Sequence, residues 1–132
     1  MRHLLTAFFF IIITLTSFSQ TQLELNQKAS EKYSEADKEL NRVYNQILTD
    51  YEDDSNFIEK LRISQRLWIK FRDAELEMKF PESDKGMNYG SIYPICKYQY
   101  LEQLTNERTE KLMEWLNPIP EGDPCTGSVK FR

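Results

Sequence analysis

The sequence predicts an all-α protein, a small antiparallel three-helix bundle with a long loop between helices 2 and 3 and an irregular C-terminal tail. Three long segments carry apolar residues at spacings of three and four, which is the period of a helix with one buried face. No segment shows the sustained alternation of a half-buried strand. With 132 residues, the chain is expected to form one domain.

The first 19 residues show the pattern of a secretory signal peptide. A short basic start precedes an apolar run from about Leu4 to Leu15, and Ser17 and Ser19 occupy the −3 and −1 places of a cleavage site. The run is short for a bilayer span of about 20 residues. We therefore expect a signal peptide at residues 1–19, an exported periplasmic or secreted protein, and no membrane span after cleavage. An uncleaved anchor is the alternative.

Composition limits the chemistry of the mature chain. The single histidine, His3, lies in the predicted signal, so no imidazole would remain for general-base catalysis or for a histidine-ligated metal. We expect no enzymatic activity, no cofactor and no metal site. The net charge of −4 argues against nucleic acid as a partner and favours a basic protein.

The three helices are expected at about residues 25–51, 55–80 and 95–116. Ser55 is the expected N-cap of the second helix, and the short acidic turn before it predicts antiparallel packing of the first two. Asn117 followed by proline ends the third helix. The helical domain would span residues 20–117 and the tail residues 118–132. The expected core comprises Leu40, Tyr44, Leu61, Trp68, Phe71, Leu101 and Leu112.

Polar residues fall on or beside the apolar stripes of all three helices. They are Asp37, Asn41, Gln65, Arg72, Glu75, Thr105 and Arg108. An unpaired buried charge is costly, so we expect the two arginines to pair with the two carboxylates between helices, with the amides and the hydroxyl completing a structural network. Two alternatives are an anion pocket formed by both arginines and acid–base chemistry by the carboxylates. The structural network is favoured, because perturbed ion pairs are more often structural than catalytic.

The segment PESDKGMNYGSIYP, residues 81–94, is long for a connection within a compact domain. Long ordered loops often carry function, so this loop is a candidate partner-binding surface, and a plain crossover is the alternative. Its candidate contact residues are Ser83, Lys85, Tyr89, Ser91 and Tyr93.

The mature chain has two cysteines, Cys96 and Cys125. In an oxidising compartment an even pair usually bridges. The sequence therefore predicts a disulfide that ties the tail to the body of the domain, with two unpaired thiols as the alternative.

Four segments resemble one known family. EADKELNRVYNQIL, LRISQRLWIKFRDAE, GSIYP and YLEQLTNERTEKL are similar to the LprI-type lysozyme-inhibitor N-terminal domain, long catalogued as a domain of unknown function. The residues that match its pattern are Ala36, Asp37, Leu40, Asn41, Tyr44, Ser64, Gln65, Arg66, Trp68, Phe71, Arg72, Asp73, Ala74, Glu75, Gly90, Ser91, Leu104, Thr105 and Arg108. Many relatives carry a cysteine directly after the R-D-A-E run, where this chain has Leu76, so the disulfide scheme of the family does not transfer.

The resemblance implies a small helical, exported domain that binds a protein partner in the cell envelope, with a basic lysozyme as the candidate. An acidic protein would be steered toward a basic lysozyme, and the loop at residues 81–94 could enter its cleft. The alternatives are an envelope or stress-related helical module without lysozyme activity, and a binder of a small anionic ligand.

Overall fold

The computed structural model describes the backbone of residues 2–131 and the side chains of residues 21–131. Its elements are α1 (Arg2–Asp50), α2 (Ser55–Lys79), α3 (Lys85–Tyr89), α4 (Tyr93–Met113) and two 3-10 turns, η1 (Glu114–Leu116) and η2 (Pro124–Thr126). The all-α class is confirmed. The described chain has a fourth α-helix, α3, because part of the predicted long loop is helical.

The predicted signal peptide, residues 1–19, lies outside the residues whose side chains the structure describes. Within the described part of the chain, no helix is both long enough and apolar enough to span a bilayer. Residues 114–131 contain one isolated bridge, between Ile119 and Phe131, and no strand.

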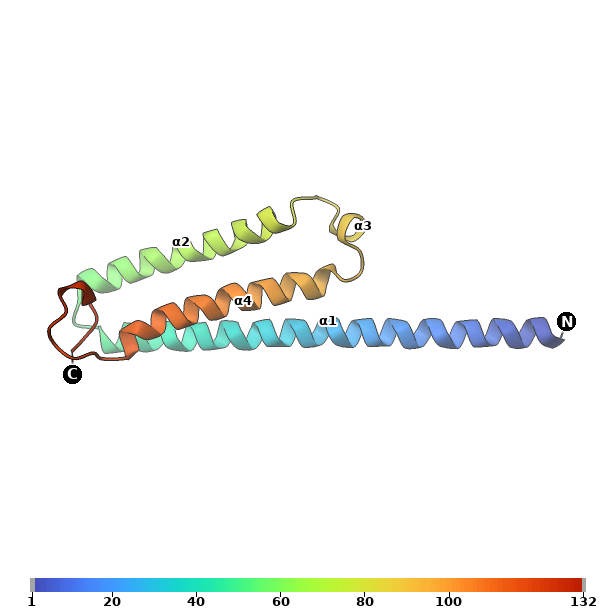
Figure 1. Cartoon of the computed structure of the whole chain (residues 1–132), viewed down its shortest axis with the longest axis horizontal. Coiled ribbons are helices and arrows are strands. Elements are labelled where there is room, and N and C mark those ends of the chain that lie inside the picture. Colours follow the sequence, from blue (N-terminus) through green and yellow to red (C-terminus); the bar gives the residue numbers. More distant parts are fainter. Residues whose placement is uncertain (1, 132) are drawn as a thin grey trace.

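The three long helices lie side by side, and α2 runs in the opposite direction to α1 and α4 (Figure 1). α4 therefore runs parallel to α1, and this pair makes the main packing contact of the molecule, while α2 contacts α4 less extensively. The segment between α2 and α4 contains α3 at one end of the bundle, and the tail folds at the other end (Figure 1).

The α1 face that packs on the other helices carries buried residues at spacings of three, four and seven, and Tyr51 continues this face directly after the last residue of α1. The buried residues of this face are Ala29, Ala36, Leu40, Val43, Ile47 and Tyr51. Such a repeat keeps one seam of a helix facing its neighbour. The core cluster consists of the last four of these residues together with Leu61 of α2 and Leu112 of α4. The hydrophobic core therefore lies toward the tail end of the bundle.

Most of the predicted core residues lie in the interior. Leu40, Leu61, Leu101 and Leu112 are buried, and Tyr44 and Trp68 are partly buried against the core cluster. Phe71 was predicted in the core and this is wrong, because its side chain is 54% exposed.

The error at Phe71 arises because α2 carries two apolar faces. The face turned inward contains Leu61 and Leu76. Phe71 lies on the outer face, in a stripe with Leu67 and Met78, which are 60% and 67% exposed. These three residues are spaced by four and seven positions, so they share one side of the helix.

The start of α2 is capped one residue earlier than predicted. Asp54, not Ser55, is the N-cap, and its side chain accepts a 2.9 Å hydrogen bond from the backbone N–H of Phe57. A carboxylate at this position satisfies one free N–H group and also interacts favourably with the positive end of the helix dipole.

The predicted disulfide between Cys96 and Cys125 is wrong, since both thiols are free. Cys96 lies in the first turn of α4, and Cys125 lies in η2, beyond the far end of that helix. The α4 residues that follow Cys96 alone span about 25 Å at the helical rise of about 1.5 Å per residue. A disulfide requires Cα atoms within about 7 Å.

The tail is held by hydrogen bonds. The hydroxyl of Tyr51, at the end of α1, donates to the carbonyl of Trp115 and accepts from the backbone N–H of Lys130, each at 3.1 Å. The indole N–H of Trp115 donates to Ser128 Oγ at 2.9 Å. These bonds fix the tail against the end of the bundle without a covalent link.

Candidate functional site

Arg108 of α4 reaches across to α2. Its Nε donates to Gln65 Oε1 at 3.0 Å, and its Nη2 donates to Ser64 Oγ at 3.0 Å. Among the described residues Arg108 forms no ion pair, so the prediction that it pairs with a carboxylate is wrong. Burial lowers the pKa of the Arg108 guanidinium from its usual value.

Arg72 binds carboxylates, but mainly on its own helix. Its Nε and Nη2 donate to Asp73 Oδ1 at 3.0 and 2.9 Å. The predicted partner on α1, Asp37, lies 4.0 Å from Nη1, which is the outer limit of an ion pair. The Arg72 side chain is only 14% exposed. A pocket with both arginines available to an anion is therefore wrong, because Arg72 is already neutralised.

Trp68 lies close to both guanidiniums. The central carbons of Arg72 and Arg108 lie 5.4 and 5.9 Å from the centre of its ring system. An aromatic face attracts a cation at this distance. Arg72 is thus stabilised by carboxylates and by the indole, whereas Arg108 is stabilised by the indole and by neutral polar groups, where the sequence predicted a carboxylate.

Glu75 lies outside the predicted network, and Asn41 joins it only through Asp37. Glu75 accepts a 3.1 Å hydrogen bond from the hydroxyl of Tyr100, and desolvation together with this bond raises the pKa of Tyr100. Asn41 is exposed and donates to the backbone carbonyl and the carboxylate of Asp37, four residues earlier on the same helix. The prediction that Glu75 pairs with an arginine is wrong, whereas Asn41 does bond within the predicted set, through its hydrogen bond to the Asp37 carboxylate.

Thr105 is fully buried, and its Oγ1 has no hydrogen-bond partner in the described part of the chain. The prediction that it completes the network is wrong as well. An unpaired buried hydroxyl costs free energy. Thr105→Val, which keeps the shape and removes the hydroxyl, should therefore raise the free energy of unfolding by about 1 kcal/mol in a urea titration.

Thr109→Val is the matched control. Thr109 is also buried, but its hydroxyl donates to the carbonyl of Thr105 at 3.0 Å. Its replacement removes a satisfied group and should give no gain in stability. A loss of stability in Thr105→Val would show that its hydroxyl is paired in solution.

The loop between α2 and α4 is fixed by polar contacts around α3. Asp84 is the N-cap of α3, and its carboxylate accepts a 2.8 Å hydrogen bond from the N–H of Met87. Lys85 donates to the carbonyl of Phe80 and pairs with Glu77 at 3.0 Å. These contacts tie α3 to the last turns of α2.

Three aromatic side chains also pack against one another within this loop and at its ends. The ring of Phe80 contacts those of Tyr89 and Tyr93 edge-on, each at 5.2 Å between centroids, and the two tyrosines stack at 5.9 Å. The hydroxyl of Tyr89 also accepts from the backbone N–H of Glu82 at 3.1 Å. Both of the predicted contact tyrosines, Tyr89 and Tyr93, therefore contribute to the internal packing of the loop.

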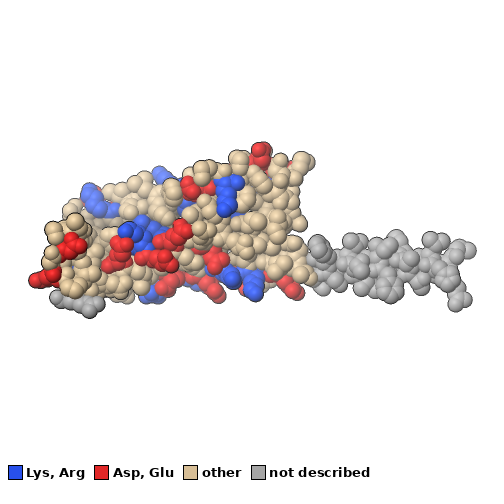
Figure 2. All heavy atoms as spheres, in the orientation of Figure 1, with Lys and Arg blue, Asp and Glu red and all other residues tan. Residues whose placement is uncertain are grey.

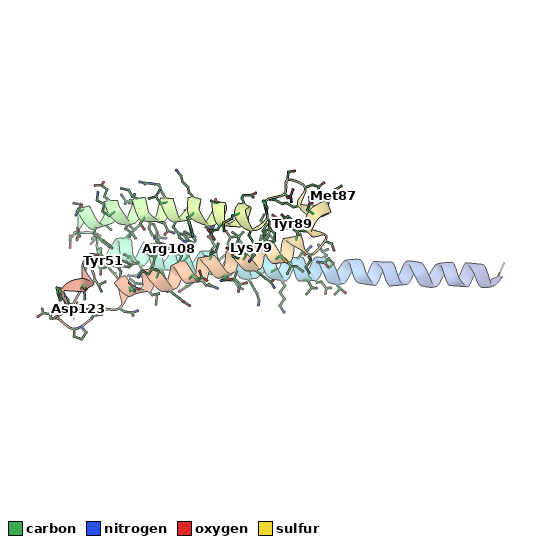
Figure 3. The ribbon with its side chains drawn as sticks, turned by 45° about the horizontal axis from the view of Figure 1, so that its top comes forward. Tyr51, Lys79, Met87, Tyr89, Arg108 and Asp123 are labelled. Carbon is green, nitrogen blue, oxygen red and sulfur yellow. The ribbon has the colours of Figure 1, made fainter. Side chains whose placement is uncertain are left out.

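The structure changes which loop residues are available to a partner. Lys85, Tyr89 and Tyr93 are only partly exposed, whereas Ser83 and Ser91 are exposed. Met87, which the sequence analysis did not select, is 83% exposed and lies on α3 at the loop end of the bundle (Figure 3). A single exposed methionine has no periodic signature, so only the conformation of α3 identifies it.

The surface is mixed in charge, with acidic side chains prominent over α1 and α4 on the face shown in Figure 2. Among the described residues no cluster of histidine, cysteine and carboxylate side chains could hold a metal ion. The described features therefore define a small helical domain with a fixed, partly apolar loop at one end and an arginine–tryptophan stack between its helices.

The chain belongs to the LprI family. The family model, described as "Lysozyme inhibitor LprI", matches residues 16–112, so the resemblance seen in the sequence is confirmed. The chain is also 34% identical over 105 residues to an uncharacterised protein of Rhizobium meliloti (strain 1021), a match that covers 71% of this chain and 73% of that protein. No solved structure matches the chain.

Proposed function

We propose that this protein is an exported, non-enzymatic domain that binds and inhibits a basic lysozyme through the loop at residues 81–94. The observation that carries the proposal is Met87, whose side chain is 83% exposed on a short helix that is fixed at both ends by hydrogen bonds. Membership of a family described as a lysozyme inhibitor supports the choice of partner.

A fixed loop is suited to binding because little conformational entropy remains to be lost when it docks. Methionine adapts its shape to an apolar partner surface, so Met87 suits the centre of such a contact. Glu82 and Asp84 are exposed on the same loop, and with the net charge of −4 they would attract a basic enzyme over a distance.

A second candidate is an envelope module whose protein partner is unrelated to lysozyme. The exposed stripe of Leu67, Phe71 and Met78 on α2 favours it, since exposed apolar patches often mark interaction surfaces. In this case the contact would be made by the middle of α2 rather than by the loop.

The test is a titration of the purified protein against several lysozyme types, with the rate of cell-wall lysis as the readout. Met87→Glu should weaken inhibition at least about tenfold, as expected for removal of a central apolar contact. Leu67→Glu is the matched variant, because it places the same charge at an exposed apolar site on α2, and it should inhibit like the unaltered protein.

Circular dichroism of both variants establishes that the helices are retained. Failure to inhibit any lysozyme type would contradict the proposal. Inhibition lost in Leu67→Glu and retained in Met87→Glu would place the contact on α2 instead of the loop.

A further inference from the structure

A groove of about 360 Å³ lies between α2, α4 and the folded tail. Its apolar lining comes from Phe57, Leu61, Leu112 and Trp115. Ser128 of the tail lines one part of it and is held there by the hydrogen bond from the Trp115 indole. The volume falls within the roughly 300–1,000 Å³ of small-molecule sites, and a mostly apolar lining with a few polar groups is typical of them.

Arg108 supplies a cation to this groove. Figure 3 places it between α2 and α4, and its hydrogen-bond partners there, Gln65 and Ser64, are both neutral. A partly desolvated guanidinium with no counter-ion is unfavourable. An anion that entered the groove would remove this penalty, and a carboxylate matches the planar arrangement of the guanidinium donors.

Two lysines, Lys60 and Lys111, line the same groove, whereas no acidic residue among those that the structure describes does so. Each lysine pairs with a glutamate close to it in the sequence: Lys60 pairs with Glu59 on α2 at 3.4 Å, and Lys111 pairs with Glu114 at the start of η1 at 2.8 Å. These pairs are exposed, with lysine side chains 66% and 60% exposed, and exposed pairs hold their partners weakly. Both lysines can therefore add positive charge near the groove.

We propose that this groove binds a small amphiphilic carboxylate. Its carboxylate would bind Arg108, and its aliphatic chain would lie against the apolar lining, where burial from water supplies most of the affinity. The three cations select the charged headgroup, and the volume limits the ligand to a small molecule. The proposal is independent of lysozyme inhibition, because the groove lies at the opposite end of the bundle from α3 (Figure 1).

The probe is decanoate, titrated calorimetrically into the purified full chain at two salt concentrations. We expect saturable binding of one decanoate per chain, weakened by added salt because charge contributes to it. Decan-1-ol, which has the same chain without the charge, should bind at least about tenfold more weakly. Acetate, which has the charge without the chain, should show no saturable binding.

Two sets of variants test the assignment to residues. Arg108→Gln should weaken decanoate binding at least about tenfold. The double variant Lys60→Gln with Lys111→Gln alters exposed side chains, so it keeps the fold and should weaken binding several-fold. Lys70→Gln, a lysine on α2 that does not line the groove, is the control and should bind decanoate unchanged.

Absence of saturable decanoate binding would overturn the proposal, as would equal affinity for decanoate and decan-1-ol. An unchanged affinity for decanoate in the double lysine variant would also overturn the proposal. If Arg108→Gln does not fold, the double lysine variant alone tests whether these cations bind the carboxylate. Inhibition of lysozyme by the double lysine variant should remain normal, which separates this site from the proposed loop contact.

Discussion

Ile47→Ala is expected to lower the free energy of unfolding by about 2–5 kcal/mol. Ile47 is completely buried and belongs to the core cluster that joins α1 to α2 and α4. Truncation removes apolar contacts and leaves a cavity, and both terms reduce stability. Equilibrium urea unfolding, followed by circular dichroism, measures this loss of stability. The slope of the free energy of unfolding against urea concentration should stay unchanged if the native fold is retained.

Leu67→Ala is the control for Ile47→Ala. Leu67 is 60% exposed, so its truncation removes little buried surface and should change stability by less than about 0.5 kcal/mol. Similar losses in the two variants would contradict the burial described for the α1 face, and would show that the outer stripe of α2 is covered in solution.

The helices themselves follow from the sequence because periodicity reports directly on burial. The spacing of Leu40, Val43 and Ile47 places them on one face of any regular helix. The acidic turn after Asp50 and Asn117–Pro118 after α4 mark helix ends by local chemistry. These signals need only neighbouring residues, so they do not depend on knowing the rest of the fold.

The periodicity of α2 does not determine which of its faces is buried. Its two apolar stripes, one containing Leu61 and the other Phe71, lie roughly a third of a turn apart around the helix. Trp68 lies close to the first stripe and is only partly buried. The choice between the stripes depends on how α2 sits against α4, and the sequence of α2 alone does not contain this information.

The partners of the inward arginines depend on how far one helix is shifted along another. A helical wheel places Arg108 on the inward side, but it carries no information on the position of α4 along α2, which decides whether Arg108 meets Gln65 or a carboxylate. The same limit applies to the cysteines. The even number of cysteines predicted a disulfide. The position of Cys125, however, depends on the path of the tail, which is set by contacts such as the hydrogen bond between Tyr51 and Lys130.

Trp68→Ala is expected to lower the free energy of unfolding by about 3–5 kcal/mol. The indole packs against the core cluster, and its ring also lies near the guanidiniums of Arg72 and Arg108. Its loss would leave a cavity between helices and would remove the aromatic ring that attracts both partly buried cations. Thermal and urea unfolding should both report the loss.

Trp68→Phe separates the two contributions to this effect. Phenylalanine retains an apolar ring and a face that attracts cations, although more weakly than indole, so we expect less than half of the loss seen with alanine. A further comparison in the background of Arg108→Gln should show a smaller effect of Trp68→Ala, because one of the two cations is then absent. If the effect of Trp68→Ala is the same with and without Arg108, the ring and that arginine act independently, and the attraction between this cation and the indole adds nothing measurable to the α2–α4 contact.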